Sequence, residues 1–452
     1  MYNNGYLRIK RDKLMLYFIM FTTTLFGTLI NNPYFLTWIC VIQLIVAIFN
    51  VRHCGYNIFS FPVLFVIFSF VFHVFRLFYS YLTGDESLMT VFWYRDSKSI
   101  SDAVHFYLLT MFFLTSGVLL SNKRGYKPIK KYNIEDMNIC LGGIILFVIG
   151  IIPKLMINYE QFIIGQTKGY LEVYEVDLTG RGTLATLVYP GIFMILIANR
   201  TKKILCNVII LVTGLYEMII MLSGNRFASL SFLLTVMLVY ITYINKISIK
   251  KTFFYVVIFV LVVAFLNTIR ENRLDGIGQM NFWKLYLEQL KENPIISLGC
   301  ELGGTLNTLI LSIKHFPKIC PYAYGMSYLM FIPNLIPKIN IHMPYDFLTF
   351  VNNFPRRDAL GGDFMGELYY NFSYFGSIFG IIIGYFVAKI QRIFEQYDNN
   401  NISAVICTPI ICHSFYYIRG YFSAYRIAIY HIIIISILVN ILSRINIGRL
   451  NK

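Results

Sequence analysis

Apolar runs of about 18 residues or more recur along nearly the whole chain, and they constrain its fold more than any other feature. Such a run can cross the hydrocarbon core of a bilayer as one helix, in which every backbone polar group is satisfied internally. Hydrophobic residues make up 57% of the 452 residues, and charged residues only 14%. Soluble domains carry more charge, typically about 25%. The sequence therefore predicts an all-α polytopic integral membrane protein.

Short polar connections separate about twelve expected transmembrane helices. The expected spans are Leu14–Asn31, Tyr34–Val51, Ile58–Leu82, Ala103–Leu120, Met137–Ile157, Thr183–Asn199, Ile204–Leu222, Ala228–Asn245, Thr252–Ile269, Glu367–Ala388, Ile402–Ile418 and Ile427–Ser443. Lys and Arg are more frequent in connections on the side of the two termini than in the opposite short loops. Because basic residues favour the cytoplasmic side, we expect both termini in the cytoplasm.

One long stretch, residues 270–366, is expected to contain no such apolar run and to lie outside the membrane on the far side. Its segment Phe282–Lys291 has the spacing of an amphipathic interfacial helix, and prolines break the remainder into short pieces. Cys300 and Cys320 are its two cysteines, and an oxidising compartment would allow a disulfide between them. We expect a single integral membrane domain, residues 1–452, with this stretch as a lid-like outer segment.

A group of arginines is expected at outer helix ends or in the outer segment. They are Arg226, Arg270, Arg273, Arg356, Arg357, Arg419 and Arg426. Arginine is depleted from short outer connections, so its presence there needs another reason. A guanidinium stays charged and offers paired donors to phosphate oxygens, which indicates an anionic substrate such as a lipid phosphate. Pairing with membrane phosphates or nearby carboxylates is the alternative interpretation.

Carboxylates gather where the chain is expected to re-enter the membrane, at Asp358, Asp363 and Glu367. Asp363 and Glu367 are four residues apart, so one helical face would present both if the helix begins early enough. Either could act as a general base on a hydroxyl, and complementing a helix dipole is the alternative. Glu217 lies inside an expected span, so it should have a cationic partner, such as Arg226 or an arginine of the last outer loop.

The remaining candidate polar residues are the histidines and two further basic residues, Arg76 and Lys154. His315 and His342 lie in the outer segment and could act as bases. For the histidines within spans, a hydrogen bond between helices is the simpler interpretation; these are His73, His105, His413 and His431. Arg76 and Lys154 lie near outer helix ends and are expected to snorkel. Zinc-type cysteine spacing, a P-loop and a dinucleotide fingerprint are all missing from the sequence, so we expect no cofactor and no metal.

This layout resembles that of the bacterial O-antigen polymerases, the Wzy family of oligosaccharide repeat-unit polymerases. Leu222-Ser-Gly-Asn-Arg226-Phe, at the junction of two expected spans, is similar to the Gly-x-Arg of that family. The stretch GGDFMGELYYNFSYFG, residues 361–376, resembles its membrane re-entry segment, and the proline-rich run before it is also similar. The chain has Asn371-Phe-Ser373 where the family often has Gly or Asn-Phe-Gly.

The resemblance implies a metal-independent glycosyltransferase of the C-type membrane fold, located in the bacterial inner membrane. It would polymerise undecaprenyl-diphosphate-linked oligosaccharide repeat units at the periplasmic face, in lipopolysaccharide biosynthesis. The expected partners are the lipid-linked donor and acceptor, membrane lipids and a chain-length regulator protein, with no nucleic acid. Arg226, Asp363 and Glu367 would then be catalytic, and the outer arginines would bind the diphosphate. A polysaccharide ligase and a lipid-linked oligosaccharide flippase are the alternatives.

Overall fold

The structure is a computed structural model and describes residues 3–121, 134–167, 181–223, 226–245, 268, 282–291, 294–336, 361–396 and 401–445. Every regular element within these residues is a helix. Nine of the described helices are long and apolar enough to cross a membrane, or ten when a bent pair counts as one span. The all-α polytopic membrane class is therefore confirmed, whereas the number of about twelve spans stays a prediction.

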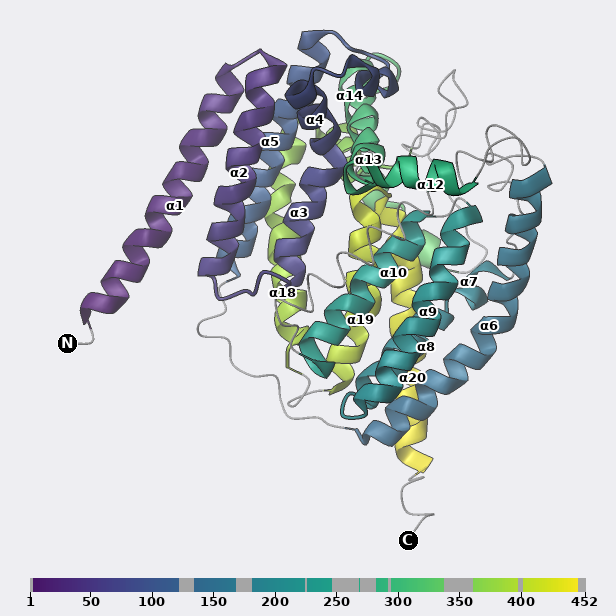
Figure 1. Ribbon diagram of the computed structural model, residues 1–452. Helices are drawn as coiled ribbons and strands as arrows, with labels where there is room; N and C mark the ends of the chain where they lie inside the picture. The colour runs from purple at the N-terminus through teal and green to yellow at the C-terminus, as the bar shows by residue number, and fades with distance from the viewer. Residues whose placement is uncertain are drawn as a thin grey trace. The chain divides into compact units, whose positions relative to one another are not determined.

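The chain divides into two compact units, and the first consists of Met1–Lys127, Gly299–Arg392 and Tyr417–Arg426. Its elements are α1 (Asn3–Leu29), α2 (Pro33–His53), α3 (Phe61–His73), α4 (Phe75–Thr83), η1 (Glu86–Val91), α5 (Ser97–Leu120), η4 (Gly303–Thr305), α14 (Leu306–His315), α15 (Met326–Leu329), η5 (Pro333–Leu335), α17 (Phe364–Phe372), η6 (Ser373–Phe379), α18 (Gly380–Phe394) and η7 (Phe422–Ala424). Within this unit α1, α2 and α5 pack side by side, and α14 packs on α17 (Figure 1).

The second unit consists of Pro128–Leu298, Ile393–Tyr416 and Ile427–Lys452. Its elements are α6 (Asp136–Thr167), α7 (Gly182–Ala185), α8 (Val188–Ala198), α9 (Lys203–Ser223), α10 (Arg226–Val239), the π-helical turn η3 (Tyr240–Ile244), α12 (Phe282–Lys291), and most of α13 (Pro294–Leu302), α19 (Asn401–Ile418) and α20 (Tyr425–Ile445). Helix α8 packs along α6. Gly143 and Gly191 permit this close approach, because a Cβ on either would lie 2.8 Å from the carbonyl oxygen of the other.

Local sequence signals explain where several helices begin and end. Asn32 caps α2 by accepting a hydrogen bond from the backbone N–H of Tyr34, and Pro33 follows at the first helical position. Asp96 caps α5 by accepting from the N–H of Ser99. Gly84 ends α4 in the left-handed conformation, which glycine adopts without steric cost. These signals confirm the short connection expected between the spans Leu14–Asn31 and Tyr34–Val51.

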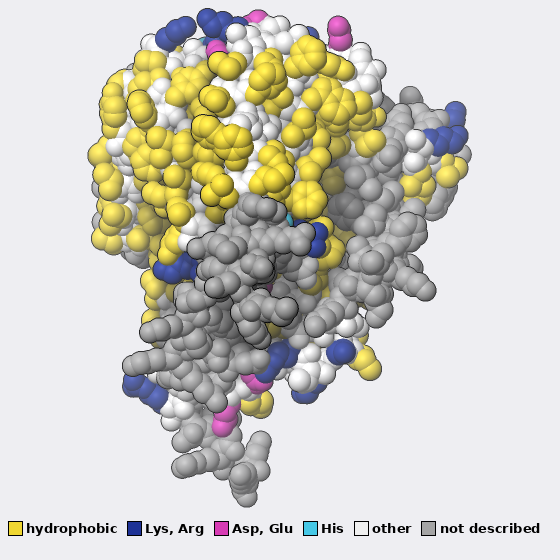
Figure 2. Space-filling model, turned by 90° about the vertical axis from the view of Figure 1, so that its left-hand side faces the viewer, with side chains coloured by type: hydrophobic (Ala, Val, Ile, Leu, Met, Phe, Trp, Pro, Cys, Tyr) yellow, Lys and Arg dark blue, Asp and Glu magenta, His cyan; other side chains and the backbone are white. Residues whose placement is uncertain are grey.

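Apolar side chains cover the outside of α1 and α2. Leu14, Phe18, Phe26, Phe35 and Phe49 are all at least half exposed. Figure 2 shows a broad field of hydrophobic side chains on this face, with Lys and Arg side chains at its upper and lower edges. A soluble surface would rarely expose so large an apolar area, whereas lipid tails solvate it well. This distribution fits helices that face the hydrocarbon core.

Two expected spans are broken rather than continuous. The span expected over Ile58–Leu82 consists of α3 and α4, which are bent by 55°. Two glycines pack closely against the residues that follow the bend. A Cβ on Gly299 would meet the ring of Phe75, and one on Gly303 would meet the backbone of Arg76. The span expected over Thr183–Asn199 is the short pair α7 and α8.

The re-entry segment also differs from a straight helix. It begins at Phe364 and breaks at Ser373, whose φ of 54° lies in the left-handed region. Because of that break η6 folds back on α17, and a Cβ on Gly376 would collide with the carbonyl of Leu368. The expected helix start at Glu367 is therefore three residues late.

The outer segment requires two corrections. Residues Ile296–His315, covering most of α13 and all of α14, are apolar and long enough to cross a membrane, so the expectation that 270–366 has no such run is wrong. Cys300 and Cys320 are both free, buried thiols and not a disulfide. The expected helix Phe282–Lys291 is present as α12. The span expected over Thr252–Ile269 lies outside the described residues apart from Thr268.

Candidate functional site

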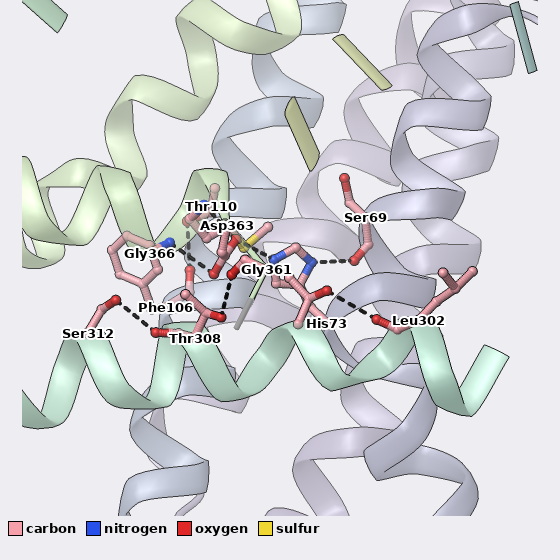
Figure 3. Close-up of polar contacts among 12 residues, drawn as sticks. Ser69, His73, Phe106, Thr110, Leu302, Thr308, Ser312, Gly361, Asp363 and Gly366 are labelled. Carbon is pink, nitrogen blue, oxygen red and sulfur yellow. Dashed lines mark hydrogen bonds and ion pairs between the residues drawn. The ribbon is translucent and has the colours of Figure 1, made fainter. Parts of the chain in front are cut away.

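A buried pair, His73 and Asp363, joins α3 to the start of α17 in the first unit. The distance from His73 Nε2 to Asp363 Oδ1 is 2.8 Å, and both side chains are inaccessible to solvent (Figure 3). His73 Nδ1 lies 2.8 Å from the backbone oxygen of Ser69. That oxygen can only accept, so Nδ1 donates to it, and Nε2 forms a hydrogen bond with the Asp363 carboxyl group. The prediction that His73 forms a contact between helices is confirmed.

Asp363 is also the N-cap of α17. Its Oδ1 accepts from the N–H of Met365 at 2.9 Å, and its Oδ2 accepts from the N–H of Gly366 at 3.0 Å. A negative charge at this position complements the helix dipole. Together with the contact to His73, these two backbone hydrogen bonds give Asp363 a well-defined role in fixing where α17 begins.

Glu367 lies one turn further along α17 and bonds to two other segments of the same unit. Ser327 Oγ donates to its Oε1 at 3.3 Å, and the backbone N–H of Phe422 donates to its Oε2 at 2.9 Å. Only 4% of the residue is exposed. Asp363 and Glu367 therefore both belong to the start of α17, as their spacing predicted, but their carboxylates have different partners.

Asn371 holds the short helix α15, which carries Ser327. Its Nδ2 donates to Ser327 Oγ at 2.7 Å and to the backbone oxygen of Glu367 at 2.8 Å, while its Oδ1 accepts from the N–H of Gly325. Gly325 has a φ of 86°, which favours glycine. No local sequence pattern predicts a role for Ser327 or Asn371, because their contact joins residues 44 positions apart.

Arg419 packs against a pair of glycines in front of α17. A Cβ on Gly361 would lie 2.6 Å from Arg419 Nε, and a Cβ on Gly362 would lie 2.8 Å from the backbone of Gly420. Thr308 Oγ1 holds the carbonyl of Gly361 at 2.9 Å (Figure 3). The glycines thus let Arg419 and Gly420 approach the segment that begins α17. Arg426 follows in the first turn of α20 and belongs to the same unit.

The other predicted arginines lie in the second unit or outside the described residues. Arg226 is the first residue of α10 and belongs to the second unit. The remaining four lie outside the described residues: Arg270, Arg273, Arg356 and Arg357. His342 and Asp358 also lie outside them. Of the predicted site residues, the first unit therefore brings together Asp363, Glu367 and Arg419, with Arg426 close in sequence.

A second buried charge pair lies within the second unit. Lys154 Nζ donates to Glu217 Oε1 at 2.8 Å, and less than a tenth of either side chain is exposed. The prediction that Glu217 needs a cationic partner is confirmed, but the expected arginine is wrong. Lys154 was expected to snorkel, and this is wrong as well. A carboxylate and an ammonium at lipid depth are each too costly to leave unpaired, which favours their pairing across helices.

Four further histidines and Arg76 bond within the protein. His105 Nε2 lies 2.7 Å from the oxygen of Ile30, and His431 Nε2 lies 2.9 Å from Thr186 Oγ1. His315 Nε2 lies 3.0 Å from Tyr94 Oη, at the end of α14. Arg76 donates to the carbonyls of Leu88 and Cys300, so it caps backbone groups instead of snorkelling. His413 Nδ1 lies 2.9 Å from the carbonyl oxygen of Pro409, within α19.

Within the described residues there is no group of three or more His, Cys, Asp or Glu side chains that could hold a metal ion. The first unit does offer a buried carboxylate, Glu367, on the helix that Asp363 caps and beside a segment that carries Arg419 and Arg426. Such a set can accept a proton and bind an anion.

One comparison with known proteins identifies the family of the chain. The family model of the O-antigen polysaccharide polymerase Wzy matches residues 13–449, which includes parts of both compact units. Searches of curated proteins and of solved structures found no match. Because the family match covers nearly the whole of a chain built from membrane-length helices, the chain belongs to the O-antigen polysaccharide polymerase Wzy family, whose members polymerise lipid-linked oligosaccharide repeat units in the inner membrane.

Proposed function

We propose that the protein transfers a growing glycan from undecaprenyl diphosphate onto a second lipid-linked repeat unit at the periplasmic face, without a metal ion. The observation that carries this proposal is the cluster at the start of α17. There Glu367 accepts a hydrogen bond from the backbone N–H of Phe422, and Arg419, three residues before Phe422, packs against Gly361. An acceptor hydroxyl oxygen attacks the anomeric carbon of the donor sugar. The bond from that carbon to the phosphate oxygen breaks, and the lipid diphosphate leaves.

Glu367 is the group that receives the proton of the acceptor hydroxyl in this proposal. Asp363 is the other carboxylate at this place, but its oxygens accept from two N–H groups of α17 and face His73. Moving a proton onto Asp363 would weaken the cap that starts the helix. The Oε1 atom of Glu367 has a longer contact, 3.3 Å to Ser327 Oγ, which a substrate hydroxyl could replace. The geometry thus favours Glu367 as the general base.

The arginines bind the diphosphates. Two lipid-linked molecules take part in the reaction, and each carries a diphosphate. In the first unit Arg419 and Arg426 serve this role, and in the second unit Arg226 does. We propose the same role, from the sequence alone, for Arg270, Arg273, Arg356 and Arg357. A guanidinium can donate two parallel hydrogen bonds to phosphate oxygens and stabilises the charge that grows on the leaving group.

The test is a reconstitution with purified protein in lipid vesicles and a synthetic lipid-diphosphate repeat unit as the only saccharide. The expected product is a ladder of lipid-linked glycans that differ by one repeat unit. A chelator should leave the ladder unchanged. If the repeat unit keeps its length and only changes leaflet, the protein is a flippase. If extension requires a different acceptor, such as a lipid A core, it is a ligase. Either result would overturn the proposal.

A further inference from the structure

The carboxylate of Glu217 joins four helices of the second unit at one point. Lys154 of α6 donates to Oε1 at 2.8 Å, and Ser229 of α10 donates to Oε2 at 2.5 Å. Tyr189 of α8 contributes its hydroxyl at 3.4 Å from Oε2, and its ring lies under the ammonium of Lys154, 3.8 Å from the centroid. Glu217 itself lies on α9. The group is buried, with Glu217 and Ser229 each 1% exposed.

The bond between Glu217 and Ser229 connects the two arms of the α9–α10 hairpin. Helix α9 ends at Ser223, and α10 begins at Arg226. Ser229 lies three residues after Arg226, so it occupies the first turn of α10, and its hydroxyl is fixed to the preceding helix. A helix turn is nearly rigid over three residues. The register of α9 against α10 therefore determines where the backbone of Arg226 lies.

Lys154 and Tyr189 make this connection stiff. An unpaired carboxylate at this depth would be expensive to bury, and the ammonium of Lys154 offsets that cost. The aromatic ring of Tyr189 stabilises the ammonium in turn through a cation–π contact. Because Lys154 and Tyr189 come from α6 and α8, which pack closely together, Glu217 is held from the body of the unit and not only from its own hairpin.

We propose that Glu217 and Ser229 are positioning residues for Arg226, which they hold at the place where it binds the diphosphate. This inference rests on the proposed function, because Arg226 has no diphosphate to bind otherwise. The two side chains do not touch substrate. They act by fixing the start of α10, and a displacement of about 1 Å in a group that acts on the transition state costs about a hundredfold in rate.

The test is a double-mutant cycle on the rate of glycan transfer in the vesicle assay. Ser229→Ala removes only the bridge between the helices and leaves the pair of Lys154 and Glu217 in place. We expect it to lower the maximal rate about 10- to 100-fold, with little change in the concentration of donor needed for half-maximal rate. Ser231→Ala is the matched control, because that hydroxyl bonds to the backbone oxygen of Phe227 within α10. It should keep the full rate.

The cycle is completed in the Arg226→Ala background. If Ser229 acts through Arg226, Ser229→Ala should cause no further loss there. An equal loss in both backgrounds, or no loss in the wild type, would overturn the inference, because Ser229 would then act independently of Arg226. The proposed role of Arg226 is tested separately by the single variant. If Arg226→Ala alone transfers glycan at the wild-type rate, the diphosphate is not bound there, and the proposed function of Arg226 fails whatever Ser229 does.

Discussion

At the scale of single residues, Gly361 and Gly362 determine how closely Arg419 and Gly420 approach the start of α17. A side chain on Gly361 would meet the flexible end of Arg419, whereas one on Gly362 would meet the backbone of Gly420. The flexible side chain can move aside and the backbone cannot. Substitution of Gly361 therefore tests the placement of Arg419, whereas substitution of Gly362 tests the packing of the backbone.

We therefore expect different outcomes for Gly361→Ala and Gly362→Ala. Gly361→Ala should displace Arg419 and lower the rate of transfer about tenfold or more, with nearly unchanged thermal stability, since one arginine contact at the site is lost. Gly362→Ala should destabilise the protein by about 1–3 kcal/mol, because the backbone must shift. Melting curves in detergent and the vesicle assay measure the two effects. Full activity of Gly361→Ala would show that the placement of Arg419 is not required.

Asp96 gives a prediction of pH dependence. The backbone N–H and then the hydroxyl of Ser99 stabilise its charged form, and they lower the pKa of Asp96 below its usual value. A lowered pKa in the folded state contributes stability above the unfolded pKa, near 4, that is lost as the pH falls through the folded pKa. The difference in melting temperature between wild type and Asp96→Ala should therefore be constant above about pH 5 and shrink below about pH 4. A difference that grows with acidity would contradict this.

At the scale of helices, glycines allow α5 and α18 to pack backbone to backbone. A Cβ on Gly384 would collide with the carbonyl of Leu114, and one on Gly117 would collide with the carbonyl of Ile381. Small residues at such positions are a common means of helix association in membranes, where packing replaces the hydrophobic effect. The spacing Gly376, Gly380, Gly384 places the three glycines four residues apart along this segment.

Gly384→Ala should separate these helices and destabilise the protein by about 1–3 kcal/mol. Gly214→Ala is the matched control, because nothing lies within 4 Å of a Cβ built there on α9. It should keep or slightly raise the melting temperature, since alanine favours a helix by up to about 1 kcal/mol over glycine. Equal melting temperatures for both variants would contradict the close packing of α5 and α18.

Helix positions followed from the sequence more readily than the contacts between them. The apolar runs and the turn residues predict α2 and α9 almost to the residue, because span length and capping are local properties. His73 and Asp363 are 290 positions apart, and no local pattern pairs them. For Glu217 the physical need for a cation was predictable, but the choice of Lys154 depends on how α6 packs on α9.

At the scale of the whole molecule, the charge distribution determines which side of the membrane each connection faces. Lys and Arg outnumber Asp and Glu by 39 to 23, and the basic residues concentrate in short connections on the side of the termini. That bias predicts cytoplasmic termini and places the 270–366 segment in the periplasm. The helix pair α13–α14 adds a further candidate span inside this segment, so the orientation requires a direct measurement.

Single cysteines introduced in a cysteine-free background measure the orientation. Asn352→Cys should react with a membrane-impermeant maleimide in intact cells whose outer membrane has been permeabilised. Asn399→Cys should react only after the inner membrane is opened. If both positions label from the same side, or the order is reversed, the proposal of a periplasmic site fails.

In the proposed mechanism Glu367 accepts the proton during glycan transfer, whereas Asp363 has a structural role. The most direct measurement is the rate at which two lipid-linked repeat units are coupled to a dimer by purified wild type and Glu367→Gln. Glutamine keeps the size and the acceptor oxygen but cannot serve as a base. If Glu367 is the base, the rate should fall about 100- to 10,000-fold with an unchanged melting temperature. Dimer formation by Glu367→Gln at the wild-type rate would contradict it.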